Sequence, residues 1–109
     1  MTPVADALDA AALAVARDAL IATWGVPDIL VNAAGGNVAR ARSDTTSVFD
    51  VPIDAYEEVL RLNLHGTVVP TLVFGKSMAE RGKGSIITIT SMAAMRSLSG
   101  VLGYSIAKA

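Results

Sequence analysis

A serine, a tyrosine and a lysine near the end of this 109-residue chain are spaced in a way that could support proton transfer. Ser91 follows a run of β-forming residues, Tyr104 comes thirteen positions later, and Lys108 comes four after that. If a helix begins at Tyr104, the i,i+4 spacing places the phenol and the ammonium group side by side. A nearby cation and the positive end of a helix both favour the ionised form of a phenol. Such a phenol could act as a general acid or base on an alcohol or carbonyl, with the serine hydroxyl holding the same oxygen.

Two runs of residues are typical of the strands that would bring these side chains together. Residues 28–32 and 85–91 are rich in apolar and β-branched side chains, as strands of a buried parallel sheet are. Residues 38–52 and 92–103 are mixed in character and are expected to be loops, the first with room for one helical turn. The order of helix, strand, helix, strand and a helix starting at Tyr104 indicates an α/β fold, a slice of a βαβ array.

Two longer segments have the apolar periodicity of helices that pack against such a sheet. The first covers residues 10–23 and has Asp9 as its N-cap. The second covers residues 53–80, where Gly66 and Pro70 interrupt the interior and predict a kink or a local widening. The buried faces are predicted to consist of Leu13, Ala16, Leu20 and Trp24 in the first helix and of Val59, Leu62, Gly66, Val69 and Val73 in the second.

The composition excludes several classes of protein and of site. With 52% hydrophobic and 17% charged residues, the chain is expected to form one packed domain at most, without disorder. A net charge of −1 without blocks of like charge argues against nucleic acid or an anionic membrane as partner. Cysteine is absent, which excludes disulfides and thiolate metal sites, and His65 is the only histidine, so neither a histidine-based metal cluster nor a Ser-His-Asp triad is expected. The lack of a basic N-terminal start and of an apolar run of about 18 residues favours a cytoplasmic protein.

The pattern S-x12-Y-x3-K, formed by Ser91, Tyr104 and Lys108, resembles the catalytic signature of the short-chain dehydrogenase/reductase family. The alternative is a pair of exposed helix residues, because Tyr-x3-Lys alone occurs widely by chance. Further segments upstream match the family's motifs in the same order and at the family's spacing, and these favour the resemblance.

The end of the first predicted strand resembles the family's Asn-Asn-Ala-Gly motif, with Ala33 in place of the second asparagine. Small residues here let the backbone approach a ligand at the carboxyl ends of the strands. In the family this stretch steadies the sheet and lies along the adenosine ribose of the cofactor, whereas the alternative is an ordinary exit from a strand into a loop. The matching residues are Asn32, Ala33, Ala34 and Gly35.

Two further positions resemble family motifs. Asp6 and Asp9 are similar to the Asp-Val-x-Asp segment, whose first aspartate contacts the adenine; the alternative is a solvent-exposed Asp6. Asn63 and Gly66 match Asn-x-x-Gly in the long helix. In the family this asparagine helps to hold a water in a proton relay to the lysine, and the alternative is an amide hydrogen-bonded within a kinked helix.

The resemblance implies a Rossmann-type parallel sheet with flanking helices and an oxidoreductase that uses NAD or NADP. Hydride would pass between the nicotinamide and a carbonyl or carbinol carbon of a small-molecule substrate. Tyr104 would transfer the hydroxyl proton, Ser91 would orient the oxygen, and Lys108 would favour the phenolate and bind the ribose. Asn63 would complete the relay, and no metal is involved. The full-length form would be a homo-oligomer, a dimer or a tetramer.

The resemblance covers only the middle of the family's fold, so residues 1–109 are interpreted as a partial NAD(P)-binding domain. The Thr-Gly-x3-Gly-x-Gly turn that cradles the pyrophosphate does not occur in the sequence, and the family's chain continues past Lys108. Residues 32–37 and 90–94 are most similar to the branch of mannonate (fructuronate) reductases, which act on sugar acids. The rival hypothesis is a truncated, non-catalytic remnant that acts at most as an interaction module.

Overall fold

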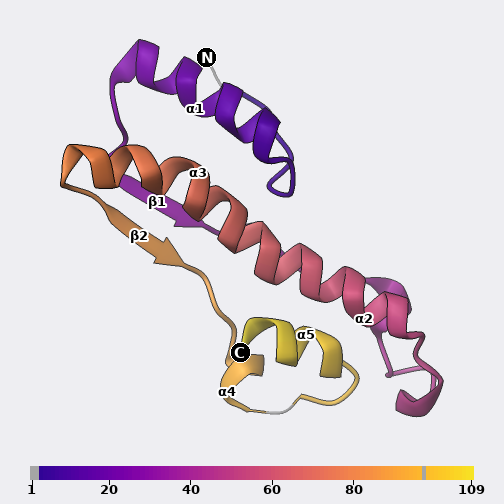
Figure 1. Ribbon diagram of the computed structural model, residues 1–109. Helices are drawn as coiled ribbons and strands as arrows, with labels where there is room; N and C mark the ends of the chain where they lie inside the picture. The colour runs from indigo at the N-terminus through magenta and orange to yellow at the C-terminus, as the bar shows by residue number, and fades with distance from the viewer. Residues whose placement is uncertain (1–2, 97) are drawn as a thin grey trace. The chain divides into compact units, whose positions relative to one another are not determined.

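The computed structural model describes residues 3–96 and 98–109 of the chain. Figure 1 shows helices alternating with two short strands, in the order expected from the sequence. The elements are α1 (Ala10–Trp24), β1 (Ile29–Asn32), the 3₁₀ turns η1 (Ala39–Ala41) and η2 (Val48–Asp50), α2 (Ile53–Leu60), the π-helical turn η3 (Arg61–His65), α3 (Gly66–Arg81), β2 (Ser85–Thr88), α4 (Met92–Met95) and α5 (Leu102–Lys108).

The chain divides into two compact units that alternate along the sequence. The first unit consists of the described residues of Met1–Ala33 together with Gly66–Ile89, and it holds α1, α3 and both strands. The second consists of Ala34–His65 and Thr90–Ala109 and is built from helices, turns and loops. Among the residues that the structure describes, no helix is both long and apolar enough to cross a bilayer.

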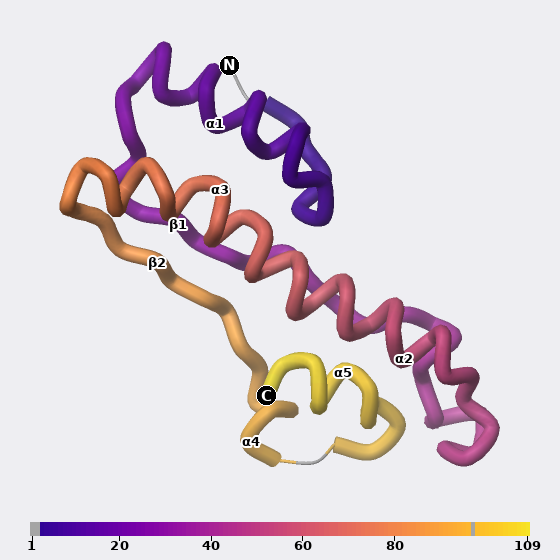
Figure 2. The backbone as a smooth tube through the Cα atoms, in the orientation of Figure 1, coloured from indigo at the N-terminus to yellow at the C-terminus, as the bar shows by residue number. Residues whose placement is uncertain are grey.

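The sheet of the first unit is a parallel pair, which confirms the expected topology. β1 and β2 run side by side from the pair Ile29↔Ser85 to the pair Asn32↔Thr88 (Figure 2). β2 ends at Thr88, three residues short of the predicted boundary at Ser91. On one face of the sheet α3 packs against both strands, and α1 packs against α3. A crossover of this kind, strand–helix–parallel strand, is the unit from which Rossmann-type sheets are built.

Helix α1 has the predicted cap and most of the predicted face. The Asp9 carboxylate accepts hydrogen bonds from the backbone N–H groups of Ala11 and Ala12, as an N-cap should. Leu13 and Ala16 are buried, but the prediction of a buried Trp24 is wrong, since its side chain is 69% exposed. Trp24 is the last residue of α1, directly before the turn at Gly25, and so lies beyond the buried part of the helix.

The second predicted helix is helical from Ile53 to Arg81, but its middle turn is a π-turn. The predicted widening is therefore present, although it falls at Arg61–His65, directly before Gly66. Pro70 lies within regular α3 and is buried there. A π-turn accommodates one extra residue per turn, and such turns recur at functional sites.

The segment between β2 and α5 differs from the predicted loop over residues 92–103. Met92–Met95 form the short helix α4, because the Ser91 hydroxyl oxygen accepts a hydrogen bond from the Ala93 N–H and caps it. Helix α5 begins at Leu102, two residues before the predicted start at Tyr104. Ser97, within the predicted loop, lies outside the described residues.

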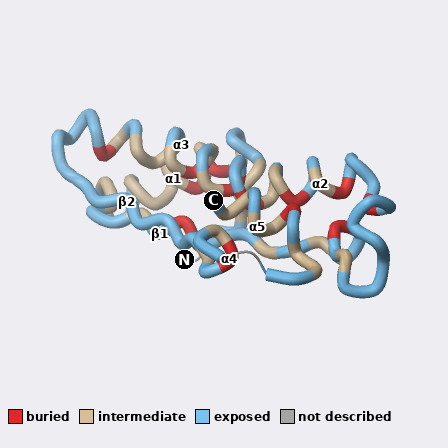
Figure 3. Tube along the Cα trace, turned by 90° about the horizontal axis from the view of Figure 1, so that it is seen from below, coloured by how far each residue is buried: buried red, intermediate tan, exposed pale blue. Residues whose placement is uncertain are grey.

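The strands expose a face that their sequences predict to be covered. Leu30 is half-buried and Asn32 is buried, but Ile29 and Val31, the alternate residues of β1, are 59% and 53% exposed. Figure 3 shows β2 exposed along its length, and its Ile87 is 45% exposed. Apolar strands with an exposed face and free edges are templates for association between chains.

We therefore expect the isolated 109-residue chain to self-associate. Size-exclusion chromatography combined with amide hydrogen exchange will measure this. The matched control is the double variant Val31→Thr/Ile87→Thr. These two residues are register partners on the exposed strands, and threonine keeps the β-branched shape while it makes the surface polar. The double variant should shift the elution towards the monomer. A sharp monomer peak for the original chain, with strongly protected strand amides, would contradict the expectation.

Candidate active site

The residues proposed for catalysis all fall in the second unit. Asn63 is in η3, Ser91 caps α4, and Tyr104 and Lys108 are one turn apart on α5. The residues proposed for cofactor binding are divided between the two units. Asp6, Asn32 and Ala33 belong to the first, whereas Ala34, Gly35, Tyr104 and Lys108 belong to the second.

Asn63 is the most constrained side chain of the set, being only 2% exposed. Its Oδ1 accepts a hydrogen bond from the Gly36 N–H at 3.0 Å, and its Nδ2 donates to the Gly36 carbonyl at 2.7 Å. The same Nδ2 also donates to the Val59 carbonyl at 2.8 Å, one turn back along the helix. A buried amide bonded to both sides of one peptide group is fixed in position and orientation. It fastens the loop after β1 to the π-turn.

Lys108 reaches the same place from α5. A Cβ atom added to Gly35 would lie 2.5 Å from Asn63 Oδ1 and 3.2 Å from Lys108 Nζ. The two polar atoms therefore occupy the same small space, no farther apart than the sum of these distances. An ammonium group and an amide oxygen beside a glycine form a polar cluster, and a side chain at Gly35 would displace it.

Ser91 and Tyr104 present one hydroxyl each. Ser91 Oγ accepts the capping bond from the Ala93 N–H at 3.1 Å, which fixes the oxygen and leaves the hydroxyl proton for donation to another group. Tyr104 is half-buried and its ring packs against the core of the second unit, which includes Val59. The arrangement can therefore offer a serine hydroxyl, a held phenol and an ammonium group.

One hydrogen bond between the segment after β2 and helix α5 was not predicted from the sequence. Thr90, directly before Ser91, donates its hydroxyl to the Lys108 carbonyl at 2.8 Å. Gly36, whose N–H and carbonyl bond to the Asn63 side chain, was likewise not predicted as a site residue. In the sequence Gly36 is the second glycine of the pair that follows β1, within the segment 32–37 that resembles the mannonate reductase branch.

In the first unit, Asn32 and Asp6 make structural contacts. Asn32 is 4% exposed and donates from Nδ2 to Thr71 Oγ1 at 2.8 Å, tying β1 to α3. Asp6 is exposed and accepts from the Leu8 N–H at 2.9 Å, in a turn before α1. Ala33, Ala34 and Gly35 are exposed and small, so the backbone at the end of β1 is open to a ligand.

The charged groups of the second unit with shifted pKa values lie on the exposed surface outside this set. The hydrogen bond from Arg40 lowers the pKa of the Asp54 carboxyl, and the one from Arg42 lowers that of Asp44. Lowered values mean that these pairs contribute stability above the pH at which unfolded carboxyls titrate. They lose it as the pH falls through the lower, folded-state values, and exposure keeps the contribution small.

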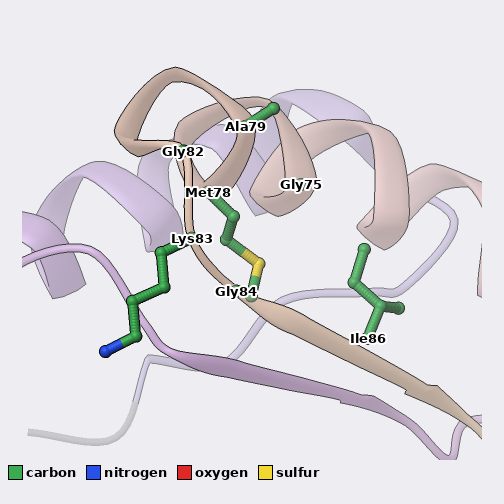
Figure 4. A pocket seen from close by; sticks show the side chains of 7 residues that line it. All are labelled: Gly75, Met78, Ala79, Gly82, Lys83, Gly84 and Ile86. Atoms are coloured by element: carbon green, nitrogen blue, oxygen red, sulfur yellow. The ribbon is translucent and has the colours of Figure 1, made fainter.

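A separate hollow in the first unit lacks the side chains that the proposed proton transfer needs. It measures about 580 Å³ and is lined by the end of α3, the following turn and Ile86 of β2 (Figure 4). Glycine, alanine, methionine and isoleucine form most of its wall, and the Lys83 side chain points away from Met78. It offers no hydroxyl or carboxylate side chain. The side chains proposed for catalysis lie instead in the second unit.

Comparison with known proteins decides the family. The sequence profile described as short chain dehydrogenase matches residues 2–109, almost the whole chain. The chain belongs to the short-chain dehydrogenase family. This confirms the resemblance predicted from the Ser-Tyr-Lys spacing and the motifs before it.

Several members of the short-chain dehydrogenase family are similar to this chain. D-threitol dehydrogenase of Mycolicibacterium smegmatis is 38% identical over 94% of this chain and 37% of its own length. A protein of Haemophilus influenzae with bound NAD, provisionally described as a D-mannonate oxidoreductase, is 34% identical with a TM-score of 0.83 over 94% of this chain and 40% of its own. Gluconate 5-dehydrogenase of Burkholderia cenocepacia, in complex with NADP and tartrate, is 28% identical with a TM-score of 0.82, over 97% and 39%.

These similarities confirm the fold class as a Rossmann-type α/β arrangement with a parallel sheet and flanking helices. The chain spans about two fifths or less of the length of the curated relatives that it matches. The solved relatives hold NAD in one case and NADP in the other.

Proposed function

We propose that this chain is the central, catalytic part of an NAD(P)-dependent oxidoreductase that acts on a carbinol or carbonyl carbon. The observation that carries the proposal is that Asn63 Oδ1 and Lys108 Nζ both lie beside Gly35, with Tyr104 one turn before Lys108 on the same helix. The buried Asn63 amide is held by hydrogen bonds on both of its polar atoms and lies near the ammonium group of Lys108. A lysine with no function would not need such a fixed polar neighbour, so the arrangement supports a role in moving or holding a proton.

Each side chain would have one task in this reaction. When bound, the cofactor supplies or accepts the hydride at its nicotinamide. The phenol of Tyr104 would give a proton to, or take one from, the substrate oxygen, and the hydroxyl of Ser91 would donate a hydrogen bond to that oxygen. Lys108 would bind the ribose, and Asn63 would hold the relay to Lys108.

The residues at the end of β1 fit a nucleotide. Ala33, Ala34 and Gly35 carry little or no side chain and are exposed, so a ribose could lie against their backbone. Asp6, exposed in the turn before α1, would contact the adenine. Either NAD or NADP satisfies this description.

For the substrate we propose a polyhydroxylated molecule, a polyol or a sugar acid such as mannonate or fructuronate. The similar proteins named above are a threitol dehydrogenase, a protein provisionally described as a mannonate oxidoreductase, and a gluconate dehydrogenase, which supports this class over a hydrophobic ketone. The proposed setting is the cytoplasm, and the proposed full-length form is a homo-oligomer. A non-catalytic remnant would not need the buried contacts of Asn63.

The proposal is tested in a chimera in which this chain replaces the matching segment of D-threitol dehydrogenase from Mycolicibacterium smegmatis. We expect the chimera to change the fluorescence of NADH or NADPH on addition of a polyol, a sugar acid or the corresponding keto compound. Comparing threitol, mannonate and gluconate with the parent enzyme assigns any change in preference to this segment. A folded chimera that binds the reduced cofactor without turnover on any of these compounds would overturn the proposal.

A further inference from the structure

A close contact between α2 and α5 lies directly under the candidate catalytic tyrosine. Gly103, the residue before Tyr104, is buried against the ring of Tyr56 from α2. A Cβ atom at Gly103 would lie 2.7 Å from Cδ1 of this ring, a distance that real Cβ atoms essentially never show, and 3.1 Å from Cε1. The Tyr56 ring therefore fills the space that the glycine leaves.

The contact between Tyr56 and Gly103 lies on the same helix faces as the proposed catalytic residues. Tyr56, Val59 and Asn63 recur at helical spacing along α2 and η3, so they share one side of that helix. Tyr104 and Ala107 of α5 pack, as Tyr56 does, against the core that contains Val59. Small residues at a helix contact let two backbones approach closely, and the largest group in the contact sets how closely.

We propose that Tyr56 and Gly103 form a positioning pair for the reaction proposed above, on which this inference rests. The ring seated on Gly103 sets the depth at which α5 lies on α2. That depth in turn sets where Tyr104 and Lys108 stand relative to Asn63. Tyr56 acts through the backbone of α5 by its ring, so its hydroxyl is dispensable.

The test is a double-mutant cycle in the chimera with Gly103→Ala, Tyr56→Ala and both together. Gly103→Ala should lower kcat by about 10- to 100-fold, because a misplacement of about 1 Å can cost up to about 100-fold. The KM for the reduced cofactor should change by less than about threefold. Adding Tyr56→Ala removes the atoms that meet the new methyl group and should restore kcat by at least about tenfold, although the cavity left by the ring lowers Tm.

Two controls separate positioning from general damage. Gly75→Ala places a methyl group in α3 at an ordinary contact distance, 3.4 Å from Ile86 Cδ1, and should leave kcat unchanged. Tyr56→Phe keeps the ring and should do the same. A double variant with a kcat below that of Gly103→Ala, or a loss with Tyr56→Phe equal to that with Tyr56→Ala, would overturn the positioning role.

The cycle also separates this inference from the proposed function. If the unsubstituted chimera has no activity, the proposed function has failed, and the contact is then judged by thermal unfolding of the same four proteins. Gly103→Ala should lower Tm when Tyr56 is present and leave it unchanged when Tyr56 is already alanine. Equal decreases in Tm in both backgrounds would overturn the inference.

Discussion

Replacing Tyr104 with phenylalanine in the chimera is expected to lower kcat by about 10²–10⁴-fold, the range for loss of a positioned acid or base. The substitution removes only the hydroxyl, and the ring can keep its packing against the core of the second unit. Cofactor affinity and Tm should therefore change little. Stopped-flow kinetics with NADH or NADPH, together with a fluorescence titration of the same cofactor, will measure the two effects separately.

Ser105→Ala is the matched control for this variant. Ser105 is the next residue on α5, and its hydroxyl donates to the Val101 carbonyl at 3.0 Å within the helix. Loss of such a bond inside a helix is close to neutral for stability. We expect nearly full turnover, and comparable losses from the two substitutions would mean that the proton is carried by another residue.

Gly35→Ala is expected to have the second large effect, on both stability and turnover. Its methyl group would lie 2.5 Å from Asn63 Oδ1 and 3.2 Å from Lys108 Nζ, so one or both groups must move. Overpacking of this kind costs about 1–3 kcal/mol of stability. Displacement of Lys108 should lower kcat by about 10²-fold. Thermal unfolding and steady-state kinetics of the chimera will measure the two changes.

Gly36→Ala separates the clash from backbone strain. The φ angles of Gly35 and Gly36 are similar, 150° and 158°, but an added Cβ at Gly36 would have no atom within 4 Å. Both variants carry comparable backbone strain, and only Gly35→Ala adds the collision. We expect kcat of Gly36→Ala to exceed that of Gly35→Ala by at least about tenfold. Equal losses of kcat would show that Asn63 and Lys108 can move aside without an effect on turnover.

The sequence was sufficient where a local signal determines the structure. The Asp9 cap, the bounds of α1 and the two strand segments follow from capping preference, helix periodicity and runs of β-branched residues. The widened turn near Gly66 was predicted from its helix-breaking residues, but its location at Arg61–His65 was not. In that turn Asn63 bonds to Gly36, a contact between residues that are 27 positions apart. No local pattern encodes such a contact.

Predictions failed or were missing where neighbours in space decide the outcome. Trp24 has the spacing of a buried residue but is exposed at the end of α1. The short helix α4 depends on the Ser91 cap, which competes with the role of Ser91 as a strand residue. Gly103 carries no signal that it would meet Tyr56, since that contact arises only when α5 packs on α2.

The division of the second unit into two stretches of chain has a consequence for the order of folding. Residues 34–65 contain Gly36, Val59 and Asn63, so the hydrogen bonds of this amide can form before α5 has been synthesised. Tyr104 and Lys108 arrive only after the whole of α3 and β2, and docking α5 must close that longer loop. The contacts that hold Asn63 in place therefore need only residues 34–65, whereas Tyr104 and Lys108 can join this amide only when α5 docks.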